Sequence, residues 1–130
     1  MDERKAVRNL ARLARSLECA TGGLTLTQYR VLAMVDDGGE RATHLAHALA
    51  LAKPTVTAAV DGLVERGLLA RDAVPGDRRS VRISLTQAGA AALQDAEAAM
   101  AERLVAVAEP AVVDALARMG PAIDGLRVSR

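Results

Sequence analysis

The chain has 130 residues, which is enough for one domain with its own core but too few for two independent ones. Apolar residues make up 51% and charged residues 25%, and the formal net charge of +1 excludes a globally basic nucleic-acid-binding protein. No run of about 18 apolar residues occurs, so we expect no membrane span. The single cysteine, Cys19, cannot form an internal disulfide, and the N-terminal segment lacks a signal peptide's apolar stretch, so we expect a cytoplasmic protein.

The periodicity of apolar residues predicts four helices in the first half of the chain. Residues 4–19 form an amphipathic helix, and Thr25 with Gln28 forms a capping box that starts a second helix ending at residues 37–39. A short third helix is expected over residues 41–50 and a fourth over 53–66, ended by Gly67. The buried face of the fourth helix is predicted to be Val56, Val60, Leu63 and Val64.

After Gly67 the apolar period changes from that of a helix to that of a strand. Residues 68–73 and 81–85 are predicted as two antiparallel strands, with residues 75–77 (Pro-Gly-Asp) as the loop between them. Thr86 then begins a long helix over 87–109, and Pro110 begins a last one over 110–127 that Gly120 and Pro121 break or kink. With one tyrosine and no Phe or Trp, the core must consist of Ala, Leu, Val and Met, which favours close packing of helices.

The predicted fold is therefore mainly α with a small β-wing (α+β): a winged helix-turn-helix lobe and a helical region. Over almost its whole length the chain resembles the MarR family of bacterial winged-helix transcriptional regulators. The most specific match is Asp77-Arg78-Arg79, followed after five residues by Leu85-Thr86 and then Gly89. Further matches in the same order are Leu24-Thr25, Gln28, Leu32, Leu45-Ala46, Leu49, Thr55-Val56-Thr57, Val60, Leu63 and Glu65-Arg66-Gly67-Leu68.

The resemblance implies a homodimer that binds double-stranded DNA. Residues 1–24 and 90–130 would form the dimerisation helices, and residues 25–89 the DNA-binding region. Members usually repress transcription, and many release DNA when a small phenolic or amphipathic ligand binds. The alternative is a winged-helix protein-interaction or architectural module without ligand control. No cofactor is implied, and the sequence has no catalytic Ser/His/Asp arrangement, phosphate loop or carboxylate pair, so we do not expect an enzyme.

The expected DNA-binding residues lie on two elements. Lys53, Thr55 and Thr57 are at the N-terminal end of the fourth helix, which meets base edges in helix-turn-helix docking; otherwise the threonines only cap and pack. In the hairpin, Arg79 would enter an A·T-rich minor groove, oriented by Asp77, while Arg78 and Arg82 would contact phosphate. The alternative is a solvated loop.

Other candidate sites are less specific. Tyr29, Arg12 and Arg15 could bind an anionic ligand, although Tyr29 is as well explained by core packing with a satisfied hydroxyl. His44 and His47 have metal-ligand spacing but lack further ligands, so we expect a surface pair and no metal site. Cys19 is interpreted as a buried or incidental cysteine rather than as a redox sensor.

Overall fold

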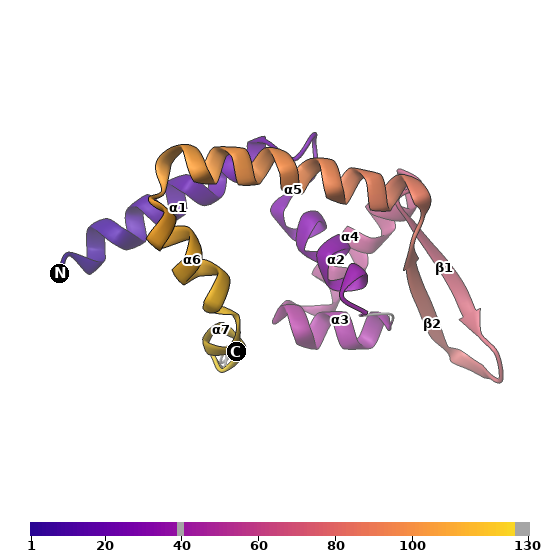
Figure 1. Cartoon of the computed structure of the whole chain (residues 1–130). Helices are drawn as coiled ribbons and strands as arrows, with labels where there is room; N and C mark the ends of the chain where they lie inside the picture. Colours follow the sequence, from indigo (N-terminus) through magenta and orange to yellow (C-terminus); the bar gives the residue numbers. More distant parts are fainter. Residues whose placement is uncertain (39–40, 127–130) are drawn as a thin grey trace.

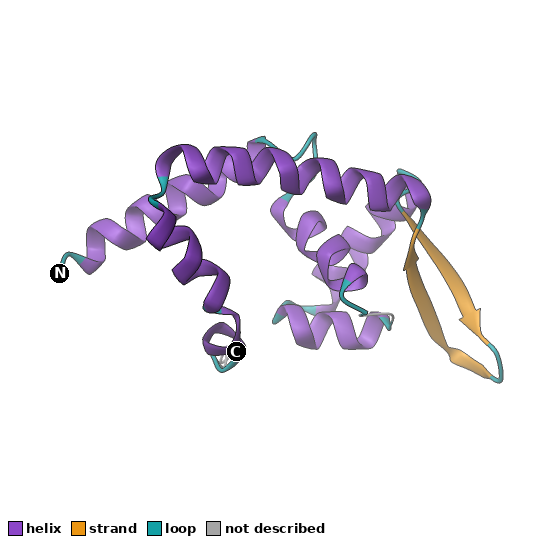
Figure 2. Cartoon of the chain, in the orientation of Figure 1, coloured by secondary structure: helices purple, strands orange, loops and turns teal. Residues whose placement is uncertain are grey.

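The computed structural model describes residues 1–38 and 41–126, apart from the side chains of residues 42, 43 and 78–80. The described part is mainly helical with one two-stranded antiparallel sheet (Figures 1 and 2). None of the described helices is long and apolar enough to cross a lipid bilayer. In chain order the elements are α1 Glu3–Cys19, α2 Leu26–Asp36, α3 Ala42–Leu49, α4 Lys53–Glu65, β1 Leu69–Val74, β2 Asp77–Leu85, α5 Gln87–Val107, α6 Pro110–Arg118 and α7 Gly120–Asp124.

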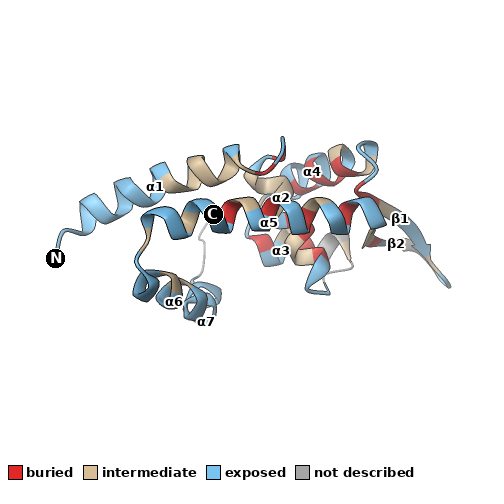
Figure 3. Cartoon of the chain, turned by 45° about the horizontal axis from the view of Figure 1, so that its top comes forward, coloured by how far each residue is buried: buried red, intermediate tan, exposed pale blue. Residues whose placement is uncertain are grey.

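The buried core lies in one half of the molecule. It joins α2, α3, α4, the base of the sheet and the first half of α5, and its largest fully buried side chains are Leu32, Leu45, Leu63, Ile83 and Val31. Figure 3 shows the buried residues gathered on these elements. The predicted buried face of α4 is confirmed for Val56, Val60 and Leu63, whereas Val64 is only partly buried.

The predicted capping box at the start of α2 is confirmed. The Thr25 hydroxyl accepts the Gln28 N–H at 3.0 Å, and the Gln28 amide oxygen accepts the Thr25 N–H at 3.1 Å. The Leu26 N–H is also satisfied, because the Glu18 carboxylate at the end of α1 accepts it at 2.6 Å. The start of α2 is therefore fixed both by its own capping box and by a hydrogen bond from the end of α1.

The predicted antiparallel hairpin is present, but the bounds of its strands and of its turn differ from the prediction. Strand β2 begins at Asp77, and Val74 pairs with Asp77, so the turn contains only Pro75 and Gly76. Gly76 has φ +79°, which residues other than glycine rarely adopt. We had expected Asp77 in the loop and the second strand to begin only at residue 81. Instead, the backbone of Asp77, Arg78 and Arg79 belongs to strand β2. A two-residue turn with glycine is sufficient to reverse the chain, so the third turn residue was not needed.

A tight joint connects the hairpin to α5. The Thr86 hydroxyl donates to the Gly67 carbonyl at 2.6 Å and accepts the Gly89 N–H at 2.9 Å, which caps α5. A Cβ atom on Gly89 would lie 1.9 Å from the Leu68 carbonyl oxygen, so only glycine permits this approach. Thr86 and Gly89 of the sequence motif are therefore explained by the geometry of this joint.

The other half of the molecule has almost no core of its own. None of the residues of α1, α6 or α7 is buried, and the second half of α5 beyond Met100 contributes no buried residue. Val107 is 72% exposed and Leu10 59% exposed. The predicted last helix is broken as expected: α6 ends at Arg118, and Pro121, which lacks an N–H, lies in the first turn of α7. We refer to α1, the second half of α5, α6 and α7 as the arms.

Candidate nucleic-acid interface

The N-terminal end of α4 presents the three predicted contact residues to solvent. Lys53, Thr55 and Thr57 are exposed, while the opposite side of α4 is held in the core by Val56 and Val60. Helix α4 is preceded by Ala52, which provides no side-chain cap, and Thr55 donates its backbone N–H to the Ala52 carbonyl at 3.0 Å. Neither threonine is buried, so packing alone does not account for them.

A shallow groove of about 160 Å³ separates this helix from the hairpin. One wall is α4 and the other is the face of the sheet that turns toward it. The groove has cationic and hydroxyl groups at its rim over an apolar floor, an arrangement suited to a polyanion with an apolar edge. Its lining residues are Lys53, Val56, Thr57, Val60, Arg71, Val81 and Ile83.

An ion pair that the sequence analysis missed connects the two walls. Arg71 on β1 donates to the carboxylate of Asp61 on α4. Both side chains are partly exposed, so the pair contributes little stability. Strand alternation could have indicated it, because Arg71 lies two residues after the buried Leu69 and pairs with the buried Ile83.

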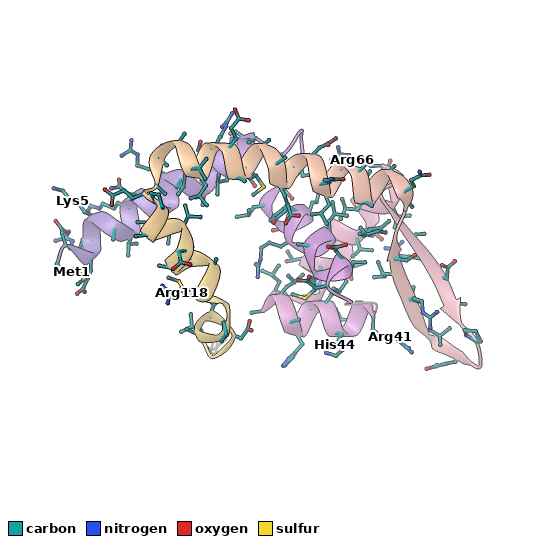
Figure 4. All side chains as sticks on the ribbon, in the orientation of Figure 1. Met1, Lys5, Arg41, His44, Arg66 and Arg118 are labelled. Carbon is teal, nitrogen blue, oxygen red and sulfur yellow. The ribbon has the colours of Figure 1, made fainter. Side chains whose placement is uncertain are left out.

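The predicted wing residues are only partly described. Arg82 is exposed, as expected, and its backbone forms an isolated bridge with Arg41, which precedes α3. Arg41 is labelled in Figure 4 between α3 and the sheet. Asp77 is exposed as well. The side chains of Arg78 and Arg79 lie outside the described residues, and so does the expected contact of Asp77 with Arg79.

The three residues expected to bind an anionic ligand each have a different intrachain partner. The Tyr29 hydroxyl donates to the Glu97 carboxylate at 2.7 Å and so links α2 to α5. Arg12 donates to the Asn9 side chain at 3.2 Å, and Arg15 to Glu18 at 2.6 Å. Burial, and then the bond to Glu97, raise the pKa of Tyr29 well above its usual value.

The remaining side chains singled out by the sequence are at the surface. His44 and His47 are exposed, in agreement with a surface pair, and the described residues contain no group of metal ligands. Cys19 is exposed and forms no disulfide, so of the two interpretations, a buried or an incidental cysteine, the buried one is wrong. The Glu18 carboxylate beside it is engaged by the Leu26 N–H and by Arg15, and these bonds lower the pKa of Glu18.

A helix-turn-helix whose second helix is exposed at its N-terminal end, next to a two-stranded hairpin, defines a winged helix-turn-helix protein. The model of the MarR family matches residues 22–80, which contain this unit. No curated protein is significantly similar in sequence.

Solved structures resemble the chain over nearly its full length. A MarR-family transcriptional regulator from Rhodococcus sp. RHA1 is 22% identical and covers 99% of both chains with a TM-score of 0.73. CouR from Rhodococcus jostii RHA1, bound to p-coumaroyl-CoA, is 24% identical, covering 95% of this chain and 92% of its own (TM-score 0.73). A mutant MarR from E. coli complexed with operator DNA is 21% identical, covering 93% and 91% (TM-score 0.73). The MarR family model thus matches the winged helix-turn-helix unit, and these solved structures share the fold of nearly the whole chain.

Proposed function

We propose that the protein is a homodimeric transcriptional repressor that binds a pseudo-palindromic operator in double-stranded DNA. The observation that carries this proposal is the exposure of Lys53, Thr55 and Thr57 at the end of α4 beside the wing. Lysine can reach guanine or phosphate, and threonine can serve base edges and the thymine methyl group. The mutant MarR that shares this fold was crystallised with operator DNA, which supports DNA binding by this chain.

The exposed apolar residues of the arms support the homodimer. Val7, Leu10, Val105, Val107 and Ile123 are each more than half exposed, on elements without a core of their own. Apolar surface of this extent is typical of association. In a two-fold dimer the two α4 helices would enter major grooves about one helical turn apart. Sedimentation equilibrium at micromolar concentration tests this, and a 13.6 kDa monomer would contradict it.

DNA binding is tested with duplexes that the protein selects from a random pool. We expect the affinity to fall steeply with salt, because cations that neutralise phosphates release counterions. Lys53→Ala should cost about 1–3 kcal/mol of affinity, and Thr57→Ala should weaken discrimination between sequences more than non-specific binding. Arg118→Ala, which removes one charge from α6, is the matched control and should bind normally. Affinity that does not change with salt would favour the alternative, a protein-interaction module.

Ligand control is the second part of the proposal. CouR, which has the same fold, was solved with p-coumaroyl-CoA. The chain has one Tyr and no Phe or Trp, so an effector would be bound weakly, by apolar burial at roughly 25 cal/mol per Å² and a few polar groups such as Tyr29, Arg12 and Arg15. Salicylate-like anions titrated into the protein–operator complex test this. If none releases DNA at millimolar concentration, the protein is a constitutive DNA-binding dimer.

A further inference from the structure

All five basic residues of α1 lie on one side of the helix. Arg4, Arg8, Arg12 and Arg15 recur every four or three residues, and Lys5 is adjacent to Arg4. Because residues three and four apart are neighbours on a helix surface, they form a continuous stripe. The apolar residues Val7, Leu10, Ala14 and Leu17 follow the opposite side. We refer to Arg4, Lys5, Arg8, Arg12 and Arg15 as the basic face of α1.

The N-terminal part of the basic face is not neutralised. Arg15 is paired with Glu18, and Arg12 donates to Asn9. In contrast, the side chains of Arg4, Lys5 and Arg8 make no hydrogen bond or ion pair with any residue that the structure describes. The carboxylate of Asp2 accepts the backbone N–H of Lys5 and caps the helix. Three exposed cations therefore lie side by side in a chain whose net charge is only +1.

The basic face is remote from the proposed operator surface and would stay exposed in a dimer. The N-terminal end of α1 and the wing lie at opposite ends of the chain (Figure 1), and Lys5 points away from α6 (Figure 4). In the proposed homodimer a second copy would cover the apolar side of α1, where Val7 and Leu10 are exposed. The N-terminal part of the opposite side, with Arg4, Lys5 and Arg8, would then face solvent.

We infer that the basic face of α1 is a second binding surface, for the sugar-phosphate backbone of duplex DNA. A helix rises 1.5 Å per residue, so Arg4, Arg8 and Arg12 are spaced about 6 Å apart. Duplex DNA carries one negative charge per roughly 1.7 Å of its axis, so each cation of such a row finds a phosphate within reach. Arginine is well suited to phosphate because its planar group donates two parallel hydrogen bonds.

A lipid surface fits these observations less well. Helices that lie on membranes insert an apolar face next to their basic residues, and here the apolar side of α1 is the side that a second copy covers. On the basic side, Ala11 with its single methyl group is the one apolar residue within the row from Arg4 to Arg15. The inferred surface would let one dimer hold a second DNA segment, and it does not depend on operator recognition through α4.

The test separates the two DNA surfaces by mutation. Lys53→Ala with Arg82→Ala removes contacts of α4 and the wing, and the remaining affinity for a random-sequence duplex is measured by fluorescence anisotropy at 50 and 200 mM salt. To this background are added Arg4→Gln, Lys5→Gln and Arg8→Gln, or Arg4→Lys with Arg8→Lys as the charge-preserving control. Three phosphate contacts weaken binding about 40-fold between these salt concentrations. We expect the glutamine variant to lose at least 10-fold in affinity at 50 mM salt, and the lysine control to lose little.

In the otherwise native protein, the glutamine substitutions should leave operator affinity unchanged but abolish capture of a second, labelled duplex by operator-bound protein. Unchanged residual binding in the glutamine variant would overturn the inference. So would dissociation of its dimer in sedimentation, because the basic face would then be a subunit contact. Binding of the lysine control to phosphatidylserine vesicles in preference to DNA would equally overturn it. Failure of the native protein to bind any operator would refute the proposed function, while the residual binding would still report on α1.

Discussion

The joint between the hairpin and α5 makes Gly89→Ala the sharpest test of the fold. The added Cβ would lie 1.9 Å from the Leu68 carbonyl oxygen and 2.9 Å from its carbon, and both are backbone atoms that no rotamer change can move. The start of α5 and the residue before β1 would have to separate. Overpacking typically costs 1–3 kcal/mol. Because Thr86 bonds both Gly67 and Leu68 at this point, the segments cannot part freely, and we expect about 3 kcal/mol.

Urea denaturation at a fixed protein concentration measures this cost, because a dimer's stability depends on concentration. With a slope of about 1–3 kcal/mol per molar urea, the midpoint should fall by at least 1 M. Gly120→Ala is the matched control, since a Cβ on Gly120 would meet nothing within 4 Å. It should change the free energy of unfolding by less than about 1 kcal/mol, in the stabilising direction. If Gly89→Ala is as stable as the control, the close approach at Leu68 is wrong.

Three further outcomes are expected. Arg79→Ala should cost about 1–3 kcal/mol of operator affinity with no change in stability, measured by anisotropy and urea titration; native affinity would remove the wing from the interface. Thr86→Ala should destabilise by about 1 kcal/mol through loss of the α5 cap, whereas Thr86→Ser should not. The pKa of the Tyr29 hydroxyl is raised in the folded protein, so its contribution to stability is complete below the unfolded pKa near 10 and is lost as the pH rises further. Absorbance of this single tyrosine should show no tyrosinate at pH 10.5 until urea unfolds the chain; tyrosinate in the folded state would contradict the bond to Glu97.

Most of the helices could be predicted because local signals determine them. The capping box of Thr25 and Gln28 involves residues three apart, and the buried face of α4 follows from its apolar period. The beginning of β2 could not be predicted in the same way. Residues 77–80 are all polar, so they show no alternation, and the strand register is irregular beside them, with a shift between Ala73 and Val74. The bridge between Arg41 and Arg82 is a single residue pair and has no pattern at all.

The candidate site likewise combines features that a local sequence pattern predicts with features that depend on residues distant in the sequence. The exposure of Lys53, Thr55 and Thr57 follows from the period of α4 and was predicted. The bond between Tyr29 and Glu97 joins residues 68 positions apart, and no local pattern indicates which carboxylate a tyrosine will meet. The sequence therefore identified Tyr29 as a side chain needing a partner without showing that α5 supplies it.

Helix α5 is the part of the molecule that can transmit a change from the arms to the DNA-binding lobe. It runs without interruption for 21 residues, from the joint at Thr86 into the arms, which corresponds to about 30 Å. A tilt of about 10° at one end of such a helix moves the other end by about 5 Å, which exceeds the base-pair rise of about 3.4 Å. We therefore expect small rearrangements between two copies' arms to change the separation of their α4 helices. Spin labels on Ala58→Cys, an exposed position of α4, in a Cys19→Ser background should report a narrower distance distribution with operator bound. An identical, narrow distribution with and without DNA would show that the lobes are held rigidly and that α5 transmits nothing.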